Sequence, residues 1–214
     1  MATRPQIDIA QPGPDAVART VGLIALIGVS VFAITCGAAQ FLRTDYNWLG
    51  MPLSFYVLGP YGRMVEAGYF VLAPGLVALG IGWYHALDRS ARRAAPLLLF
   101  VLGAIALVVT AVEFTDMPER PHTLHGSIHV LAAAVTFFSV TIAMLLQSWR
   151  LRTDPRWRHR FRSAFTLAAI TFVALWVYAL ERAIPRGIGE KVVIVLILAW
   201  LWRAGWWLAR DRTG

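Results

Sequence analysis

Hydrophobic and polar positions alternate along this chain in long blocks. Six apolar stretches are separated by shorter polar segments, and each stretch has about the 17–25 residues that a helix needs to cross a hydrocarbon layer of roughly 30 Å. Because backbone in lipid must satisfy its own hydrogen bonds, stretches of this length predict helices rather than strands. The stretches are Thr20–Leu42, Met64–Leu87, Pro96–Phe114, Gly126–Trp149, Ala164–Leu180 and Val192–Leu208.

The composition agrees with a membrane protein. Hydrophobic residues make up 58% of the chain and charged residues 15%, whereas soluble domains contain roughly 25% charged residues. In 214 residues the six stretches leave little room for a soluble domain. We therefore predict an all-α fold, a polytopic bundle of six transmembrane helices that forms one domain over residues 18–210. Residues 1–17 are polar and proline-containing, and they are predicted to be a disordered cytoplasmic tail.

Basic residues are unevenly divided between the two sets of connecting segments. The set with the two termini, Asp88–Ala95 and Arg150–Ser163 holds 14 of the 20 basic residues and five acidic ones, a net charge of +9. The other set holds six basic and seven acidic residues, a net charge of −1. Short loops rich in Lys and Arg stay cytoplasmic, so both termini are predicted to be cytoplasmic. We interpret the basic run Arg156–Arg162 as an anchor against anionic lipid, and predict no nucleic-acid partner.

The segment Arg43–Arg63 is apolar but does not have the pattern of a seventh span. It is interrupted by Pro52 and by Gly59-Pro60, and it includes several aromatic residues, among them Tyr56. Irregular backbone within a membrane is tolerated only where protein or water covers it. The sequence therefore predicts an interfacial segment before the second helix, with Tyr56 turned inward. Such a segment serves either as a lid over a cavity or as a connector whose aromatic residues lie in the interfacial belt.

Acidic and histidine residues gather in the non-cytoplasmic segments. Glu113 and Asp116 are three residues apart, and His125 and His129 are four apart, so each pair shares a face if its segment is helical. A short turn joins the two pairs, which predicts that the four side chains meet at one depth. Two imidazoles with a carboxylate from a neighbouring helix suit a divalent metal ion, with Asp116, His125 and His129 as candidate ligands. The alternative is that both histidines only form structural hydrogen bonds.

Two further acidic residues belong to the same predicted region. Glu66 lies near the start of the second stretch and Glu190 just ahead of the sixth. Ionisable residues in membrane spans usually face a bundle interior or water, so both are candidate ligand-binding residues with Tyr56 and Glu113. A haem site is disfavoured, because two axial histidines normally come from different helices at matching depth, and no such pair is evident.

At these same residues the chain resembles a bacterial and archaeal family of six-span membrane proteins, domain of unknown function 998. The resemblance implies the fold and the topology, and a bacterial or archaeal cytoplasmic membrane as the location, but no activity. The matching motifs are Leu53-Ser54-x-Tyr56-x-x-Gly59-x-x-Gly62, Thr115-Asp116, Thr123-x-His125-Gly126-x-x-His129 and Gly187-x-x-Glu190-Lys191.

Three classes of function are compatible with this pattern. The first is a binding or accessory protein whose outward-facing polar pocket holds a metal ion, a lipid headgroup or a partner protein. The second is a metal-assisted membrane hydrolase in which Glu113 activates a water molecule. The third is a small proton-coupled transporter. We favour the first class, because most acidic residues lie at one face and no polar path continues toward the cytoplasm.

The charge distribution makes a direct prediction about topology. Reporter domains fused after Trp149 and after Gly214 should both report a cytoplasmic location. A reporter fused within the Arg43–Arg63 segment is the internal control and should report the opposite side. A non-cytoplasmic signal from either of the first two fusions would overturn the assignment.

Overall fold

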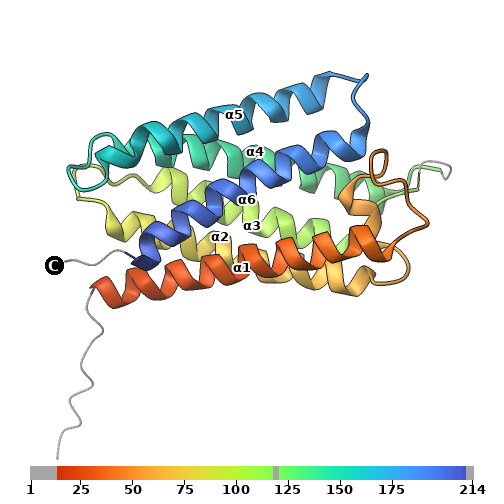
Figure 1. Ribbon diagram of the computed structural model, residues 1–214, viewed down its shortest axis with the longest axis horizontal. Helices are drawn as coiled ribbons and strands as arrows, with labels where there is room; N and C mark the ends of the chain where they lie inside the picture. The colour runs from red at the N-terminus through yellow and green to blue at the C-terminus, as the bar shows by residue number, and fades with distance from the viewer. Residues whose placement is uncertain (1–13, 118–120, 211–214) are drawn as a thin grey trace, which may run out of the picture.

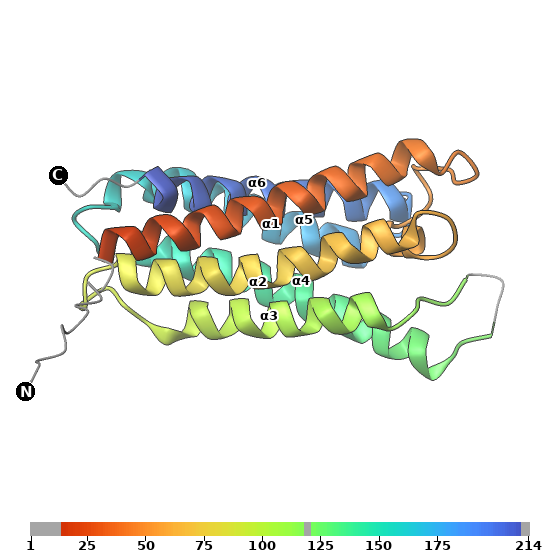
Figure 2. The same ribbon diagram turned by 90° about the horizontal axis from the view of Figure 1, so that it is seen from below.

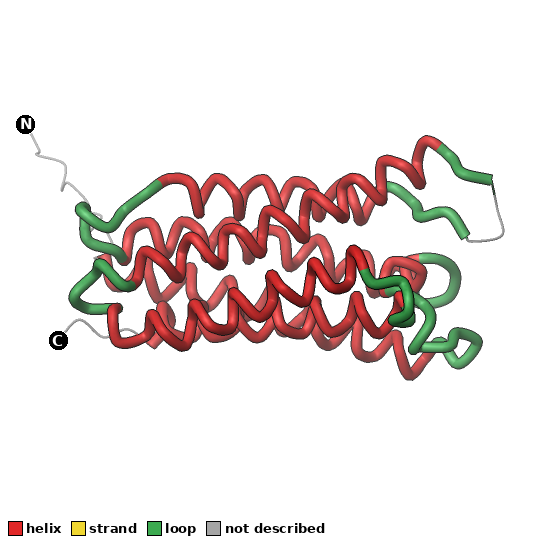
Figure 3. The backbone as a smooth tube through the Cα atoms, turned by 90° about the horizontal axis from the view of Figure 1, so that it is seen from above, coloured by secondary structure: helices red, strands yellow, loops and turns green. Residues whose placement is uncertain are grey.

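The computed structural model describes residues 14–117 and 121–210 of the chain. Within these residues it contains six long α-helices and two short 3₁₀ helices, and no strand (Figure 3). The elements are α1 (Pro14–Leu42), η1 (Leu53–Val57), α2 (Gly62–Ala86), α3 (Ala94–Val112), α4 (Leu124–Leu151), η2 (Arg158–Arg160), α5 (Phe161–Leu180) and α6 (Arg186–Arg210).

All six long helices are long and apolar enough to cross a membrane. Each coincides with one predicted stretch to within a few residues, so the prediction of an all-α, six-span bundle is confirmed and the chain is a multi-pass integral membrane protein. The largest differences are six residues each: α1 begins at Pro14 rather than at Thr20, and α6 begins at Arg186 rather than at Val192. α1 begins at Pro14, a residue well suited to a first helical turn. Residues 14–17 are therefore helical, while the rest of the predicted tail lies outside the described residues.

The six helices form a closed ring in chain order. Each helix packs against the next one, and α6 packs against α1 as well as α5. The helices run roughly along one axis, and the start of α1 and the end of α6 lie at the same end of the bundle (Figures 1 and 2). The opposite end is formed by the α1–α2, α3–α4 and α5–α6 connections, and we call it the η1 end.

At the end of the bundle that includes the chain termini, aromatic packing joins the two connections. The buried Trp157 ring lies edge-on to Trp83, with 4.8 Å between ring centroids, and Trp157 Nε1 donates to Ala86 O at 3.2 Å. Asp154 accepts from Asp88 N at 2.9 Å. These contacts hold the α4–α5 connection against the α2–α3 connection, whereas the candidate site lies at the η1 end.

Candidate functional site

The α1–α2 connection is bound to the first turn of α6 by backbone hydrogen bonds. Gly187 N donates to Gly50 O at 3.0 Å, and Ile188 N donates to Leu49 O at 2.9 Å. The first N–H groups of a helix have no partner within the helix. Here the carbonyl groups of Leu49 and Gly50 accept hydrogen bonds from these N–H groups of α6. The free donors of the helix and the free acceptors of the irregular segment are therefore paired with each other.

Two side chains of α6 extend this contact. Glu190 Oε2 accepts from Leu53 N at 2.9 Å, and Leu53 is the first residue of η1. Lys191 Nζ donates to Trp48 O and, at 3.0 Å, to Met51 O. The acid binds a backbone donor and the base binds backbone acceptors, so this neighbouring pair is not an ion pair but a clamp on the polypeptide chain.

Gly187 is required by the closeness of this approach. A Cβ atom on Gly187 would lie 2.5 Å from Met51 O and 2.7 Å from Leu49 O, nearer than a carbon and an oxygen can pack. The motif Gly187-x-x-Glu190-Lys191 therefore has a structural explanation. Gly187 leaves space for the backbone of the α1–α2 connection, and one turn later Glu190 accepts from that backbone while Lys191 donates to it.

Arg43 anchors the other side of the same connection, and sequence reasoning missed it. Its guanidinium forms a bidentate pair with Asp45 at 2.9 and 2.8 Å, donates to Leu58 O and lies 3.8 Å from the centroid of the Tyr46 ring. The hydrogen bonds to Asp45 raise the pKa of Arg43, and those from Arg43 lower the pKa of Asp45. The sequence does contain a signal for this ion pair, because Asp45 follows two residues after Arg43 at the end of the first apolar stretch.

Tyr56 is fully buried, at 0% exposure, and is turned inward as predicted. Its ring lies edge-on to Tyr46 at 5.2 Å, and Lys191 Nζ is 5.3 Å from its centroid. Burial raises the pKa of the Tyr56 hydroxyl, which has no hydrogen-bond partner among the described residues. Tyr56 thus packs the α1–α2 connection onto α6.

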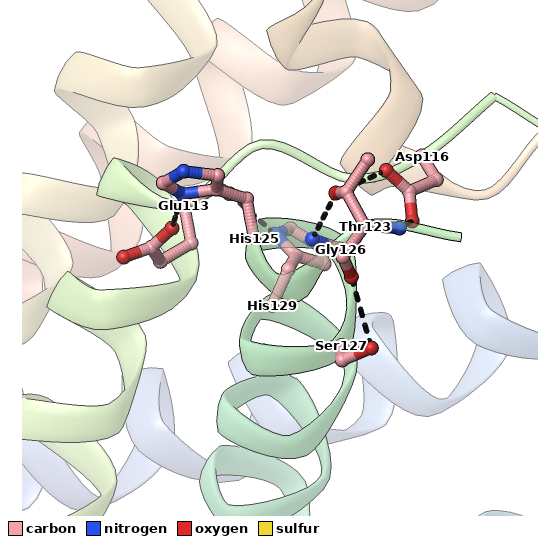
Figure 4. A network of polar contacts seen from close by, with 7 residues as sticks. All are labelled: Glu113, Asp116, Thr123, His125, Gly126, Ser127 and His129. Carbon is pink, nitrogen blue, oxygen red and sulfur yellow. Dashed lines mark hydrogen bonds and ion pairs between the residues drawn. The ribbon is translucent and has the colours of Figure 1, made fainter. Parts of the chain in front are cut away.

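The α3–α4 connection is closed by a second polar cluster (Figure 4). Thr123 is the N-cap of α4, since its Oγ1 accepts from Gly126 N at 3.0 Å. Asp116 accepts from Thr123 N at 2.8 Å and from Thr123 Oγ1 at 2.7 Å. These two hydrogen bonds lower the pKa of Asp116, and the one from the backbone N–H of Thr123 has the larger effect. A Cβ atom on Gly126 would lie 2.0 Å from Asp116 Oδ2, so the cluster requires glycine there.

Both predicted histidines of α4 bind Glu113, but in different ways (Figure 4). His125 Nδ1 lies 2.6 Å from Glu113 Oε2, which confirms the expected contact with a carboxylate. That contact is at the surface rather than in the bundle interior, because 72% of the His125 side chain is exposed. His129 is 3% exposed, and its Nδ1 lies 2.7 Å from the backbone oxygen of Glu113.

The structure corrects one step of the sequence argument. α3 ends at Val112, so Glu113 and Asp116 do not share a helix face. Among the described residues, no group of three or more His, Cys, Asp and Glu side chains is placed to hold a metal ion. Asp116 binds Thr123 instead, and metal binding by Asp116, His125 and His129 stays a prediction without geometric support.

A cavity of about 1060 Å³ lies inside the ring below the η1 segment. Its deep walls are apolar and include Leu72 of α2, Leu107 of α3, Val140 of α4 and Leu201 of α6. The α1–α2 connection covers one end, where Gly50, Met51, Pro52, Ser54 and Phe55 line the cavity. This arrangement favours the lid interpretation over a free connector.

Three of the predicted site residues line this cavity and four do not. Asp116, His129 and Glu190 are among its lining residues. Tyr56 packs behind the lid, Glu66 is half-buried elsewhere on α2, and Glu113 and His125 lie beside the cavity at the surface. Sequence reasoning missed the lining residues Tyr69, Thr110, Tyr178 and Arg186, because isolated polar residues in apolar spans give no periodic signal.

The clamp on the α1–α2 connection predicts an asymmetry between two glycines. Gly187→Ala should lower the stability of the detergent-solubilised protein by about 1–3 kcal/mol, because the new methyl group overlaps the Leu49 and Met51 carbonyls. Gly37→Ala is the matched control: nothing lies within 4 Å of a Cβ there, so better helix propensity should leave stability unchanged or raised. Thermal unfolding measures both, and equal effects would contradict the clamp.

The Asp116 cluster predicts a pH-dependent contribution to stability. The folded-state pKa of Asp116 is lowered, so its contribution is present above the ordinary Asp pKa of about 3.9 and is lost as pH falls through the lowered value. The melting temperature of the wild type should therefore exceed that of Asp116→Asn above about pH 5. The difference should shrink below about pH 4. A difference that is constant with pH would contradict this role.

Comparison with known proteins is consistent with this architecture. Residues 26–207 match the model of a family described as "Protein of unknown function (DUF998)". No curated protein and no solved structure matches the chain. The matched range extends from α1 to the last turn of α6 and includes every residue of the lid, both polar clusters and the cavity. The chain belongs to the DUF998 family.

Proposed function

We propose that this membrane protein binds an amphiphilic molecule, such as a lipid, in the cavity under the η1 segment. The single observation behind the proposal is the division of the cavity wall: deep apolar side chains, and polar groups at one end from Glu190 and His129. A cavity of about 1060 Å³ is at the upper end of the range for small-molecule sites. An apolar tail and a polar head match this division.

The length of the apolar part supports a chain-like ligand. Glu190 and Leu201 both line the cavity and are eleven residues apart on α6, which corresponds to about 16 Å along a helix. Leu72 and Leu76 of α2 line the same cavity. A ligand with an extended hydrocarbon chain would remove this surface from water, and so be stabilised by the hydrophobic effect.

The cavity also reaches the lipid-facing surface between α4 and α5. Leu131 of α4 lines the cavity although it is 67% exposed, and Val130 beside it is exposed as well. Aromatic packing closes the α4–α5 contact only farther along, where Phe138 and Trp176 lie 5.5 Å apart. α5 is the least buried of the six spans. These features support entry of the ligand sideways from the bilayer.

The proposal includes the orientation and domain limits expected from the sequence. Both termini are cytoplasmic, because 14 of the 20 basic residues belong to that end, and the η1 end with its lid faces outward. Residues 18–210 act as one membrane domain. The ligand-binding residues are Glu190 and His129, while Tyr56, Glu113 and Asp116 support the segments around them.

The other functions considered from the sequence have less support. A metal-assisted hydrolase needs a ligand set for its metal, and no such group occurs among the described residues. A proton-coupled transporter needs polar groups through the whole bundle, whereas the deep wall of the cavity is apolar. Binding of an amphiphile requires only the cavity and its lining residues, without a metal ion or a polar path across the bundle.

The proposal predicts that filling the cavity displaces a bound amphiphile. Ala134→Trp places an indole in the cavity wall of α4, whereas Ala67→Trp places one on the exposed surface of α2 as a matched control. Native mass spectrometry of protein purified in a mild non-ionic detergent should find retained membrane amphiphile on the wild type and on Ala67→Trp. Occupancy of Ala134→Trp should fall several-fold.

Circular dichroism and thermal unfolding establish that both variants fold before occupancy is compared. If folded Ala134→Trp retains as much amphiphile as Ala67→Trp, the cavity is not the binding site. If the wild type itself retains none and binds no added 1-dodecanol, the proposed function is wrong.

A further inference from the structure

We propose that the polar end of the cavity recognises a protonated amine, so that the bound molecule is an amine-bearing amphiphile. This inference rests on the proposed function, since it names the head of the molecule whose tail fills the apolar part. It follows from the hydrogen-bonding character of the two side chains at that end, Glu190 and His129.

Glu190 is a buried carboxylate that forms no ion pair with a described residue, although Lys191 and Arg186 lie close enough to interact with it electrostatically. It is 7% exposed and lines the cavity, and its contact to protein is the backbone N–H of Leu53. Among the described residues, no Lys, Arg or His nitrogen forms an ion pair with it, because the neighbouring Lys191 is turned to the carbonyls of Trp48 and Met51. A buried charge without a partner is strongly unfavourable. A cationic ligand would neutralise this carboxylate.

His129 offers a second acceptor to the same space. Its Nδ1 lies 2.7 Å from the carbonyl oxygen of Glu113, and a carbonyl can only accept, so Nδ1 is the nitrogen with the proton. In the neutral ring Nε2 is then a lone-pair acceptor. Nε2 is buried and has no hydrogen-bond partner among the described residues, while His129 lines the cavity. A buried polar atom of this kind requires a donor.

Both acceptors lie within the first turns of their helices and on residues that line the cavity. His129 is five residues into α4 and Glu190 four residues into α6, or about 6–8 Å from the start of helices that begin at the same end. Tyr69 and Tyr178 line the same cavity as Glu190. Aromatic rings beside a carboxylate are a favourable setting for an ammonium group, which binds to ring faces as well as to anions.

An anionic head is less well matched. Arg186 is the one Arg or Lys that lines the cavity within the described residues. One of its five N–H groups donates to Tyr178 O at 2.7 Å, and the guanidinium is held over the Tyr178 ring, 4.1 Å from the ring centroid. The acceptors therefore determine the preference: an ammonium group has three donors and no acceptor, the complement of a carboxylate and an imidazole lone pair.

The test compares ligands that share a tail and differ in the head. Binding of dodecylammonium and of 1-dodecanol to the wild type is measured by native mass spectrometry in the same non-ionic detergent. A charge-assisted hydrogen bond to Glu190 predicts that dodecylammonium binds about tenfold tighter or more. Butylammonium separates a free amine from an amphiphile: it has the same head with a short tail, and it should bind far more weakly than dodecylammonium.

Two substitutions assign the preference to the named atoms. Glu190→Gln retains an oxygen for Leu53 N–H but removes the charge, so the preference for the amine over the alcohol should disappear while dodecanol still binds. His129→Asn retains a donor for the Glu113 carbonyl but removes the Nε2 acceptor, and it should weaken amine binding several-fold. Glu66→Gln, outside the cavity, is the control and should bind as the wild type does.

The outcomes separate the two proposals. Equal binding of dodecylammonium and dodecanol to the wild type would overturn the amine inference and leave the cavity as an amphiphile site, and this comparison needs no variant to fold. Full amine preference in folded Glu190→Gln would also overturn it. Loss of both ligands only in Ala134→Trp supports the cavity, whereas binding of both ligands unchanged by Ala134→Trp would remove the proposed function itself.

Discussion

The structure of the η1 end depends on one constraint: an irregular backbone segment within a membrane must have its polar groups satisfied by protein. The α1–α2 connection meets this constraint through α6. Gly187 and Ile188 donate to its carbonyls, and Glu190 accepts from Leu53 N. Because these contacts use the N–H groups that any helix leaves unpaired, α6 starts earlier than its apolar stretch, and its first two turns become the wall of the η1 end.

This constraint also determines what the cavity can bind. Glu190 is placed for its contact with the lid, but one backbone N–H does not neutralise a carboxylate, and Lys191 points away to other backbone groups. At the α3–α4 connection, His129 uses one ring nitrogen for the Glu113 carbonyl and leaves the other buried without a hydrogen-bond partner among the described residues. Residues that close the two connections therefore supply two acceptors, both on side chains that line one cavity with apolar deep walls.

The helices could be predicted from the sequence because the hydrophobic effect and the hydrogen bonding of the backbone act on every residue of a span. The six apolar stretches locate the helices to within a few residues. The start of α6 differs from the prediction because tertiary contacts replace lipid there: the lid accepts hydrogen bonds from the first turn of α6, which begins at Arg186. The sequence pattern predicts Glu113 and Asp116 on one helix face, but α3 ends at Val112. Beyond that end, the backbone oxygen of Glu113 accepts from His129 and the Asp116 carboxylate accepts from Thr123.

The candidate site was predictable only in part, for a related reason. The sequence indicates which end of the bundle collects acids and histidines, and the contact of His125 with Glu113 follows from the short connection. It does not indicate which partner each side chain chooses. By residue type, Asp116 suits a metal ion and a hydrogen bond to a helix-capping residue equally well, and only the position of Thr123 shows the second role. Arg43 also donates to the backbone oxygen of Leu58, fifteen residues on, and Tyr178 contacts Arg186 across the α5–α6 connection; both contacts depend on how a turn folds.

Direct observation of the cavity in a bilayer tests the central claim, that it is a binding site with an apolar tail region and a polar head region. An electron cryomicroscopy map of the protein in lipid nanodiscs is the appropriate measurement. The account predicts elongated density between α4, α5 and α6, with its head between Glu190 and His129 beneath a lid that contacts α6. A cavity filled by rearranged side chains of the protein, with Glu190 paired to a basic residue, would contradict it.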